Sequence, residues 1–148
     1  MVEPVKDLLS RADIALVVDR FYAKAVEDEQ IGYLFEGLDL MNHLPVIYDF
    51  WENILWRTGA YKGGMMYKHL MLHSRKPLRL EHFQRWLELF VQTIDEHYQG
   101  PHANTMKQLA YSVANTIYAR VSQQNHLPIG IQDAPNETSA KAGSASSE

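Results

Sequence analysis

HSRKPLRLEHFQRW, residues 73–86, is the stretch that decides the fold. Pro77 interrupts the chain, and an apolar pattern with helical spacing follows it over about residues 80–98. Trp86 lies within that pattern, thirteen residues after His73. The stretch therefore predicts a long helix with a wide buried face, preceded by a shorter segment that carries a histidine.

Other segments show the same helical spacing of apolar residues. One begins after Ser10 and another after Asn42, and both residues are suitable N-caps. A last helix is expected over about residues 102–124, and residues 65–73 are expected to form a short helix at best. No strand is expected, so the predicted fold class is all-α.

Length and composition limit the kinds of protein that this chain can be. It has 148 residues, 46% of them hydrophobic, which suits one globular domain. The domain is expected over residues 1–126, because residues 127–148 are rich in Ser, Ala, Gly and Pro and are predicted to be disordered. The net charge of −4 argues against nucleic acid as a partner, and no apolar run reaches the ~20 residues that span a membrane. Without an apolar signal core near its first residue, the chain is expected to be cytoplasmic.

The sequence contains no cysteine. A disulfide framework, a thiolate nucleophile, an iron–sulfur cluster and a cysteine zinc site are therefore excluded. A transition metal would need histidine, carboxylate, tyrosine or methionine ligands. The chain has seven histidines, which makes histidine the first candidate.

Aromatic residues and a histidine upstream extend the pattern of residues 73–86. They are Phe21-Tyr22, Phe35, and His43 placed eight residues before the Trp of a Phe50-Trp51 pair. Together with the HFQRW segment of the long helix, they resemble the truncated haemoglobins, and among these the third group. The resemblance covers residues 14–120. It implies a truncated-globin 2-on-2 helical sandwich around haem b, held without covalent bonds because the Cys-x-x-Cys-His motif is missing.

Two histidines compete for the iron. The resemblance places the iron ligand on a short helix before the long one. Counting back from Pro77 and Trp86 gives His73, whereas counting forward from Tyr61 gives His69, one helical turn earlier. We expect His73 to be the ligand, with His69 as the alternative, because a long helix is a better ruler than a glycine loop that tolerates insertions.

The resemblance also implies a distal pocket for a gas ligand. Tyr22 and Trp86 would donate hydrogen bonds to the ligand, and His43 would stand at the entrance. Each of these residues also has an ordinary reading as a core or surface side chain, and Trp51 and Trp56 are expected to be core residues only. The side chains expected to contact the haem, besides the iron ligand, are Phe35, Ile47, Phe50, Trp86 and Phe90.

Three functions remain open at this stage. The first is reversible binding of O2, CO and NO, with oxygen storage, sensing or transport as its outcome, in a monomeric bacterial protein. The second is an enzyme that uses the same haem for nitric oxide dioxygenation or peroxide chemistry, with a reductase as its partner. Three polar groups in the distal pocket favour slow oxygen release, which suits this chemistry better than transport. The third is a haem-free helical module that binds another protein.

Overall fold

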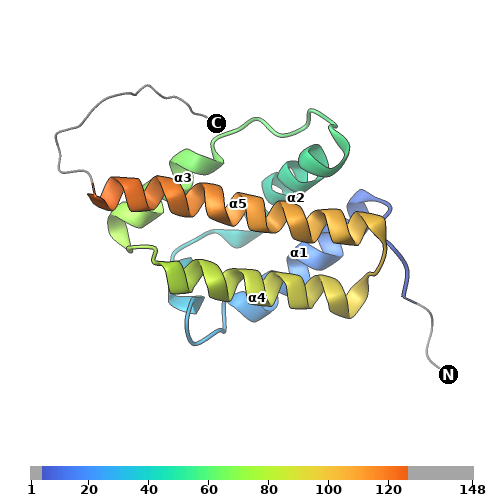
Figure 1. Cartoon of the computed structure of the whole chain (residues 1–148), viewed down its shortest axis with the longest axis horizontal. Helices are drawn as coiled ribbons and strands as arrows, with labels where there is room; N and C mark the ends of the chain where they lie inside the picture. The colour runs from blue at the N-terminus through green and yellow to red at the C-terminus, as the bar shows by residue number, and fades with distance from the viewer. Residues whose placement is uncertain (1–4, 127–148) are drawn as a thin grey trace.

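The computed structural model describes residues 5–126 of the chain. The predicted C-terminal tail, residues 127–148, lies outside the described residues. Within residues 5–126 the secondary structure is helical, apart from one isolated bridge between Lys6 and Tyr98. The elements are α1 (Arg11–Ala25), the short 3-10 helix η1 (Gly32–Phe35), α2 (Leu40–Trp56), α3 (Met65–Arg75), α4 (Leu80–His97) and α5 (Pro101–His126) (Figure 1). The all-α prediction is confirmed.

Two helix starts differ in detail from the prediction. Ser10 occupies the N-cap of α1, but its side chain makes no capping bond, and its carbonyl accepts the N–H groups of Asp13 and Ile14 instead. The start predicted at Asn42 is wrong, because α2 begins at Leu40 with Asp39 at the N-cap. The Asn42 amide donates to the Asp39 carboxylate and is thus held inside the first turn of the helix.

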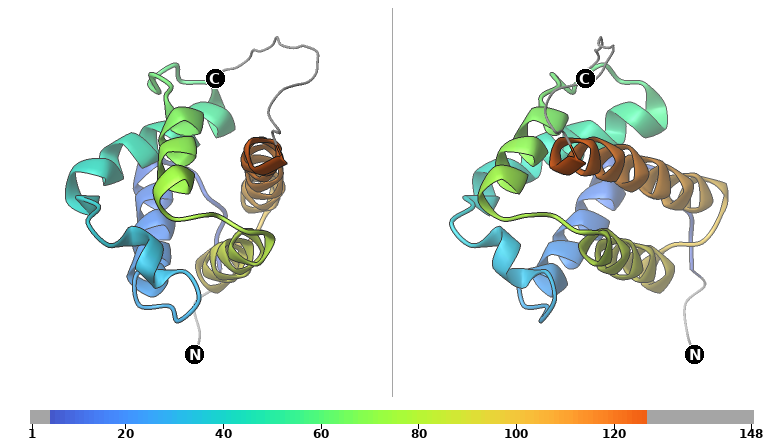
Figure 2. Two further views of the ribbon diagram at one scale, coloured as in Figure 1. Left: turned by 90° about the vertical axis from the view of Figure 1, so that its left-hand side faces the viewer. Right: turned by 60° about the vertical axis from the view of Figure 1, so that its left-hand side comes forward.

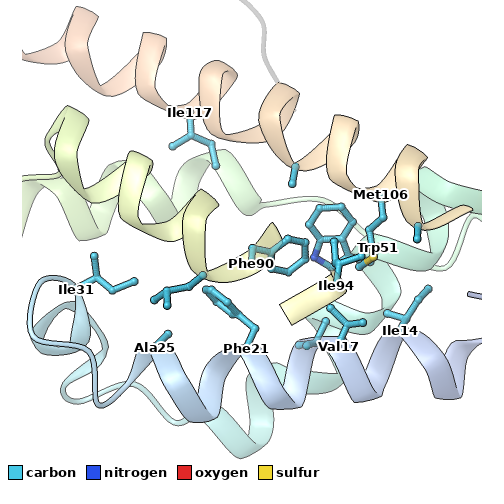
Figure 3. Close-up of a cluster of buried hydrophobic side chains, with 14 of the residues drawn as sticks. Ile14, Val17, Phe21, Ala25, Ile31, Trp51, Phe90, Ile94, Met106 and Ile117 are labelled. Carbon is cyan, nitrogen blue, oxygen red and sulfur yellow. The ribbon is translucent and has the colours of Figure 1, made fainter. Parts of the chain in front are cut away.

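The helices form two packed pairs that lie on one another. The helix α1 packs against α2 and α4, and α5 packs against α4 and α2, while α3 packs mainly against α5 (Figures 1 and 2). Figure 3 shows where the pairs meet, with Phe21 of α1 facing Phe90 of α4 and Met106 of α5 nearby. All three side chains are essentially fully buried, and burial of this kind stabilises the fold by roughly 1.5–3 kcal/mol for each side chain. None of the helices in the described part is long and apolar enough to cross a membrane.

The first turn of α5 is capped from a distant part of the sequence. The Asp7 carboxylate accepts the backbone N–H groups of His102 and Ala103 at 2.9 and 2.8 Å, and that of Leu8 at 2.8 Å. These donors would otherwise have no partner within the helix. Gly100 precedes the helix with φ of 144°, and a Cβ there would lie 2.6 Å from Cγ of Asp7. The close approach of Asp7 therefore requires glycine at position 100.

Replacing Asp7 by alanine should destabilise the folded protein by about 1–2 kcal/mol, the usual cost of losing a helix cap. Burial raises the pKa of Asp7, but the three backbone donors lower it more, so the net pKa lies below the ordinary 3.8. This stabilisation is thus present above pH 3.8 and is lost as the pH falls through the lower folded pKa. Urea unfolding at pH 7 and pH 3 measures both effects. Glu29→Ala, at an exposed site, is the control; an equal loss in both variants would contradict the prediction.

Candidate cofactor-binding site

A cavity of about 690 Å³ opens among the helices. Residues from α1, η1, α2, α3, α4 and α5 line its wall. Among these helices, α3 packs mainly against α5. The cavity therefore lies where α3 stands away from α1 and α2. Most of the lining is apolar or aromatic, and both the volume and the lining are typical of sites for cofactors and small ligands.

His69 lies in the wall of this cavity, on α3. Its Nδ1 is 2.8 Å from the carbonyl oxygen of Met65, one turn earlier in the helix. A carbonyl oxygen only accepts, so Nδ1 carries the proton and Nε2 keeps its lone pair. Burial lowers the pKa of His69 below 6.5, which favours the neutral ring. The side chain thus has the tautomer, charge and fixed orientation that a metal-binding imidazole needs.

His73 is also buried, but it is absent from the cavity wall. Its Nδ1 accepts the backbone N–H of Leu78 at 2.9 Å, so in the neutral ring the proton sits on Nε2. This bond holds the connection between α3 and α4. The structure therefore gives no support to the preference for His73 over His69. Both histidines lie on α3, which continues to Arg75, so His73 is one turn beyond His69 on the same helix.

Tyr22 faces the cavity from α1. Its ring packs edge-on against Phe21 and Phe35, with ring centroids 5.0 and 5.6 Å apart. The hydroxyl makes no hydrogen bond to the side chains of residues 5–123 or to the described backbone. Burial raises the pKa of Tyr22 to about 12, so the hydroxyl keeps its proton at neutral pH. The cavity thus contains a phenol that is ready to donate.

Trp86 lines the cavity from α4 and belongs to a stack of three aromatic rings. Phe90 lies between Trp86, at 4.9 Å and 8°, and Trp51 of α2, at 5.0 Å and 20°. Phe90 itself is 1% exposed and is absent from the cavity wall, so its contact with a cofactor stays a prediction. It is stacked on the rings of both tryptophans. Trp51, expected only in the core, is buried and also lines the cavity.

Four more of the side chains predicted for the site line the cavity. His43, Ile47 and Phe50 line it from α2, and Phe35 lines it from η1. They join Tyr22 and Trp86, so the structure brings together residues that are far apart in the sequence.

Sequence reasoning missed a set of residues on and near α3. Met65 and Leu72 lie one turn on either side of His69 and share its cavity-facing side. Lys68 lines the cavity edge beside Arg75, which the sequence had offered as a possible propionate partner without a firm assignment. If His69 had been taken as the iron ligand, the positions of Met65 and Leu72, four residues before it and three after it, would have predicted that they share its side of the helix. The other missed residues are Tyr61 before α3, which packs edge-on against Phe50 at 5.2 Å, and His82 at the start of α4.

His82 closes one edge of the cavity. Its Nδ1 accepts the backbone N–H of Arg79 at 2.9 Å, so the neutral ring carries its proton on Nε2, which lies 3.0 Å from the hydroxyl of Tyr33. Burial lowers the pKa of His82, which favours this neutral form. The contact ties the start of α4 to η1, next to Phe35.

Comparison with known proteins identifies relatives of the same kind. No family model matches the chain. The Group 3 truncated hemoglobin ctb of Campylobacter jejuni is 28% identical over 115 residues, which cover 74% of this chain and 88% of the relative. The crystal structure of the group III truncated hemoglobin from Campylobacter jejuni is similar to this one with a TM-score of 0.71 and 27% identity, covering 80% of this chain and 95% of that chain.

The structure has the fold of a truncated globin, with the 2-on-2 arrangement of helices. Both relatives belong to the third group of truncated haemoglobins. The resemblance of this chain to that group is therefore confirmed in sequence and in fold.

Proposed function

We propose that this protein binds haem b non-covalently and, through it, the diatomic gases O2, CO and NO. The observation that carries the proposal is the neutral His69 ring, which keeps a free Nε2 lone pair in the wall of an apolar cavity of about 690 Å³. His69 would be the iron ligand. When bound, the haem supplies an iron atom with one exchangeable position for a gas.

The chain's own residues would select and hold the gas. The Tyr22 hydroxyl and the Trp86 indole N–H are both donors, and both residues line the cavity. These donors would favour O2 over carbon monoxide, because O2 held by the haem would be the more polarised ligand and the better hydrogen-bond acceptor. Half-buried His43 would stand at the distal entrance, and Ile47 and Phe50 would exclude water.

The two cations at the cavity edge would hold the haem propionates. Lys68 and Arg75 lie seven residues apart on α3, which places them on the same side of the helix, and both line the cavity. Their charges would orient the porphyrin more than they would anchor it, because an exposed ion pair contributes only about 0–1 kcal/mol. The apolar lining and His69 would provide most of the affinity.

A second function on the same scaffold is turnover of nitric oxide with bound oxygen, or of peroxide. It is favoured by the presence of Tyr22, Trp86 and His43 in a single cavity, because polar groups beside a gas slow its release and stabilise charge that develops on it. Measurement of nitric oxide turnover in the presence of a reductase separates this enzyme from a reversible gas binder. A haem-free helical module is the remaining alternative.

Adding ferric haem to the purified protein should produce an intense Soret band at a ratio of one haem per chain. Because the sequence has no cysteine, acidified butanone should then extract all the pigment from the polypeptide. Spectroscopic titration, followed by extraction, measures both results. The absence of a Soret band after reconstitution would contradict the proposal and favour the haem-free alternative. Haem that stayed with the chain would contradict non-covalent binding.

A further inference from the structure

The charge of the chain is divided unevenly. Residues 57–79 contain six of its fourteen Lys and Arg residues and none of its eighteen Asp and Glu residues. All the other residues together thus carry eight cations against eighteen acids. This stretch comprises the loop before α3, α3 itself and the connection to α4, and we name its surface the cationic face. Its cations are Arg57, Lys62, Lys68, Arg75, Lys76 and Arg79.

The cations of this face are not neutralised by the described part of the polypeptide. In the haem-loaded protein the propionates would offset Lys68 and Arg75, and the other four cations would keep their charge. None of the six lies within 4 Å of a carboxylate oxygen in the described part of the chain, whereas five cations elsewhere are paired in that way. Lys76 donates to the backbone carbonyl oxygens of Tyr33 and Glu36, which fixes its position but leaves its charge in place. The paired cations elsewhere are Lys6, Arg11, Lys24, Arg85 and Lys107.

The cationic face also exposes apolar side chains beside the cavity. Tyr67 and Met71 lie one turn apart on α3, are 67% and 40% exposed, and line the cavity edge together with Lys68 and Arg75. Figure 2 shows α3 on the outside of the helix bundle. A small apolar centre surrounded by like charges is suited to brief, oriented contact with a protein of opposite charge.

We propose that the cationic face docks an acidic electron-donor protein, with a flavin or an iron–sulfur cluster, that reduces the haem iron. The inference rests on the proposed function, because the iron must be ferrous to bind O2. The donor would lose one electron and ferric iron would gain it. His69 lies on the same helix as Lys68 and Met71, and a helix with its side chains is roughly 10–12 Å wide, so a donor on this face would lie about one helix away from the iron.

The charge distribution favours a protein over a lipid surface. An extended anionic surface would also meet the rest of the chain, which carries ten more acids than cations, and would be repelled by it. The acidic patch of a docked protein can be confined to the cationic face.

The test compares two double variants of the haem-loaded full-length protein with the same change in net charge. Lys62→Glu/Arg79→Glu alters the cationic face outside the cavity lining, and Arg20→Glu/Lys107→Glu alters α1 and α5. The probe is a reduced, acidic [2Fe–2S] ferredoxin. At low ionic strength the first variant should be reduced about tenfold more slowly than the parent, and the second at close to the parental rate. The difference should shrink as salt is added.

Two further measurements make the outcome decisive. Reduction by the lumiflavin semiquinone, a small uncharged donor, should be the same in all three proteins, since access to the iron is unchanged. Calorimetric titration with oxidised ferredoxin should show weaker binding only for Lys62→Glu/Arg79→Glu, and it tests docking independently of electron transfer. If the parent failed to take up haem, the proposed function would be contradicted. The calorimetric titration with ferredoxin would still test whether the cationic face docks an acidic protein.

Equal reduction rates for the two variants at low ionic strength would overturn the inference. A second result would also overturn it: Lys62→Glu/Arg79→Glu binds ferredoxin as the parent does, but it alone no longer sediments with phosphatidylglycerol–phosphatidylcholine vesicles. That result would assign the face to anionic lipid.

Discussion

His69→Gly is expected to abolish haem retention at micromolar concentrations, because one imidazole nitrogen supplies the only protein bond to the iron in the proposed site. Imidazole added to the solution should enter the vacated space and restore a Soret band. Haem affinity, measured by transfer of haem to an excess of apomyoglobin, quantifies the loss. The matched control is His73→Gly, which removes a buried histidine from the same helix, one turn away.

The control separates loss of the ligand from loss of the fold. His73→Gly removes the bond to the Leu78 N–H and should lower the stability of the protein by roughly 1–3 kcal/mol while haem uptake persists. Thermal unfolding of both variants without haem measures their stability directly. Loss of haem in His73→Gly together with full retention in His69→Gly would show that the sequence-based choice of His73 was correct.

Tyr22→Phe and Trp86→Phe are each expected to speed O2 release by about ten- to a hundredfold. Each variant removes one donor that would hold bound oxygen, and a hydrogen bond to a charged group contributes about 1.5–3 kcal/mol. The release of carbon monoxide should change much less, which makes it the internal control. Stopped-flow displacement of each gas measures the rates.

The double variant Tyr22→Phe/Trp86→Phe adds a test of geometry. If both donors reach one ligand, the two effects should not add. Release at the parental rate in both single variants would mean that neither side chain contacts the gas. The haem could still be bound in that case, so this experiment tests the distal side separately from His69.

The sequence predicted the helices well because their causes are local. The apolar spacing around Trp86 and Phe90 marks α4, and Gly100-Pro101 marks the break before α5. The start of α2 was less accurate, because Asp39 as a cap and the bond from Asn42 to Asp39 depend on geometry that the residue types do not determine.

The histidine proposed to bind iron could not be chosen from spacing. His69 and His73 are one turn apart on the same helix, and the choice depends on which flanking segment has a different length. The hydrogen bonds distinguish them, since the Nδ1 of His69 donates to a carbonyl and the Nδ1 of His73 accepts an N–H. Phe90 was assigned to the cavity for a similar reason, because helical spacing locates the buried side of α4 but does not separate the cavity wall from the layer behind it.

If the protein binds gas as proposed, the stack of Trp86, Phe90 and Trp51 makes its gas affinity adjustable from a distance. Phe90 touches both tryptophans, so a smaller residue there would let both rings tilt, although residue 90 never meets the cavity. The orientation of the Trp86 N–H would then change without any change in the donor itself. Variation at this hidden position offers natural selection, or a protein engineer, a way to shift oxygen release gradually while the residues around the gas stay the same.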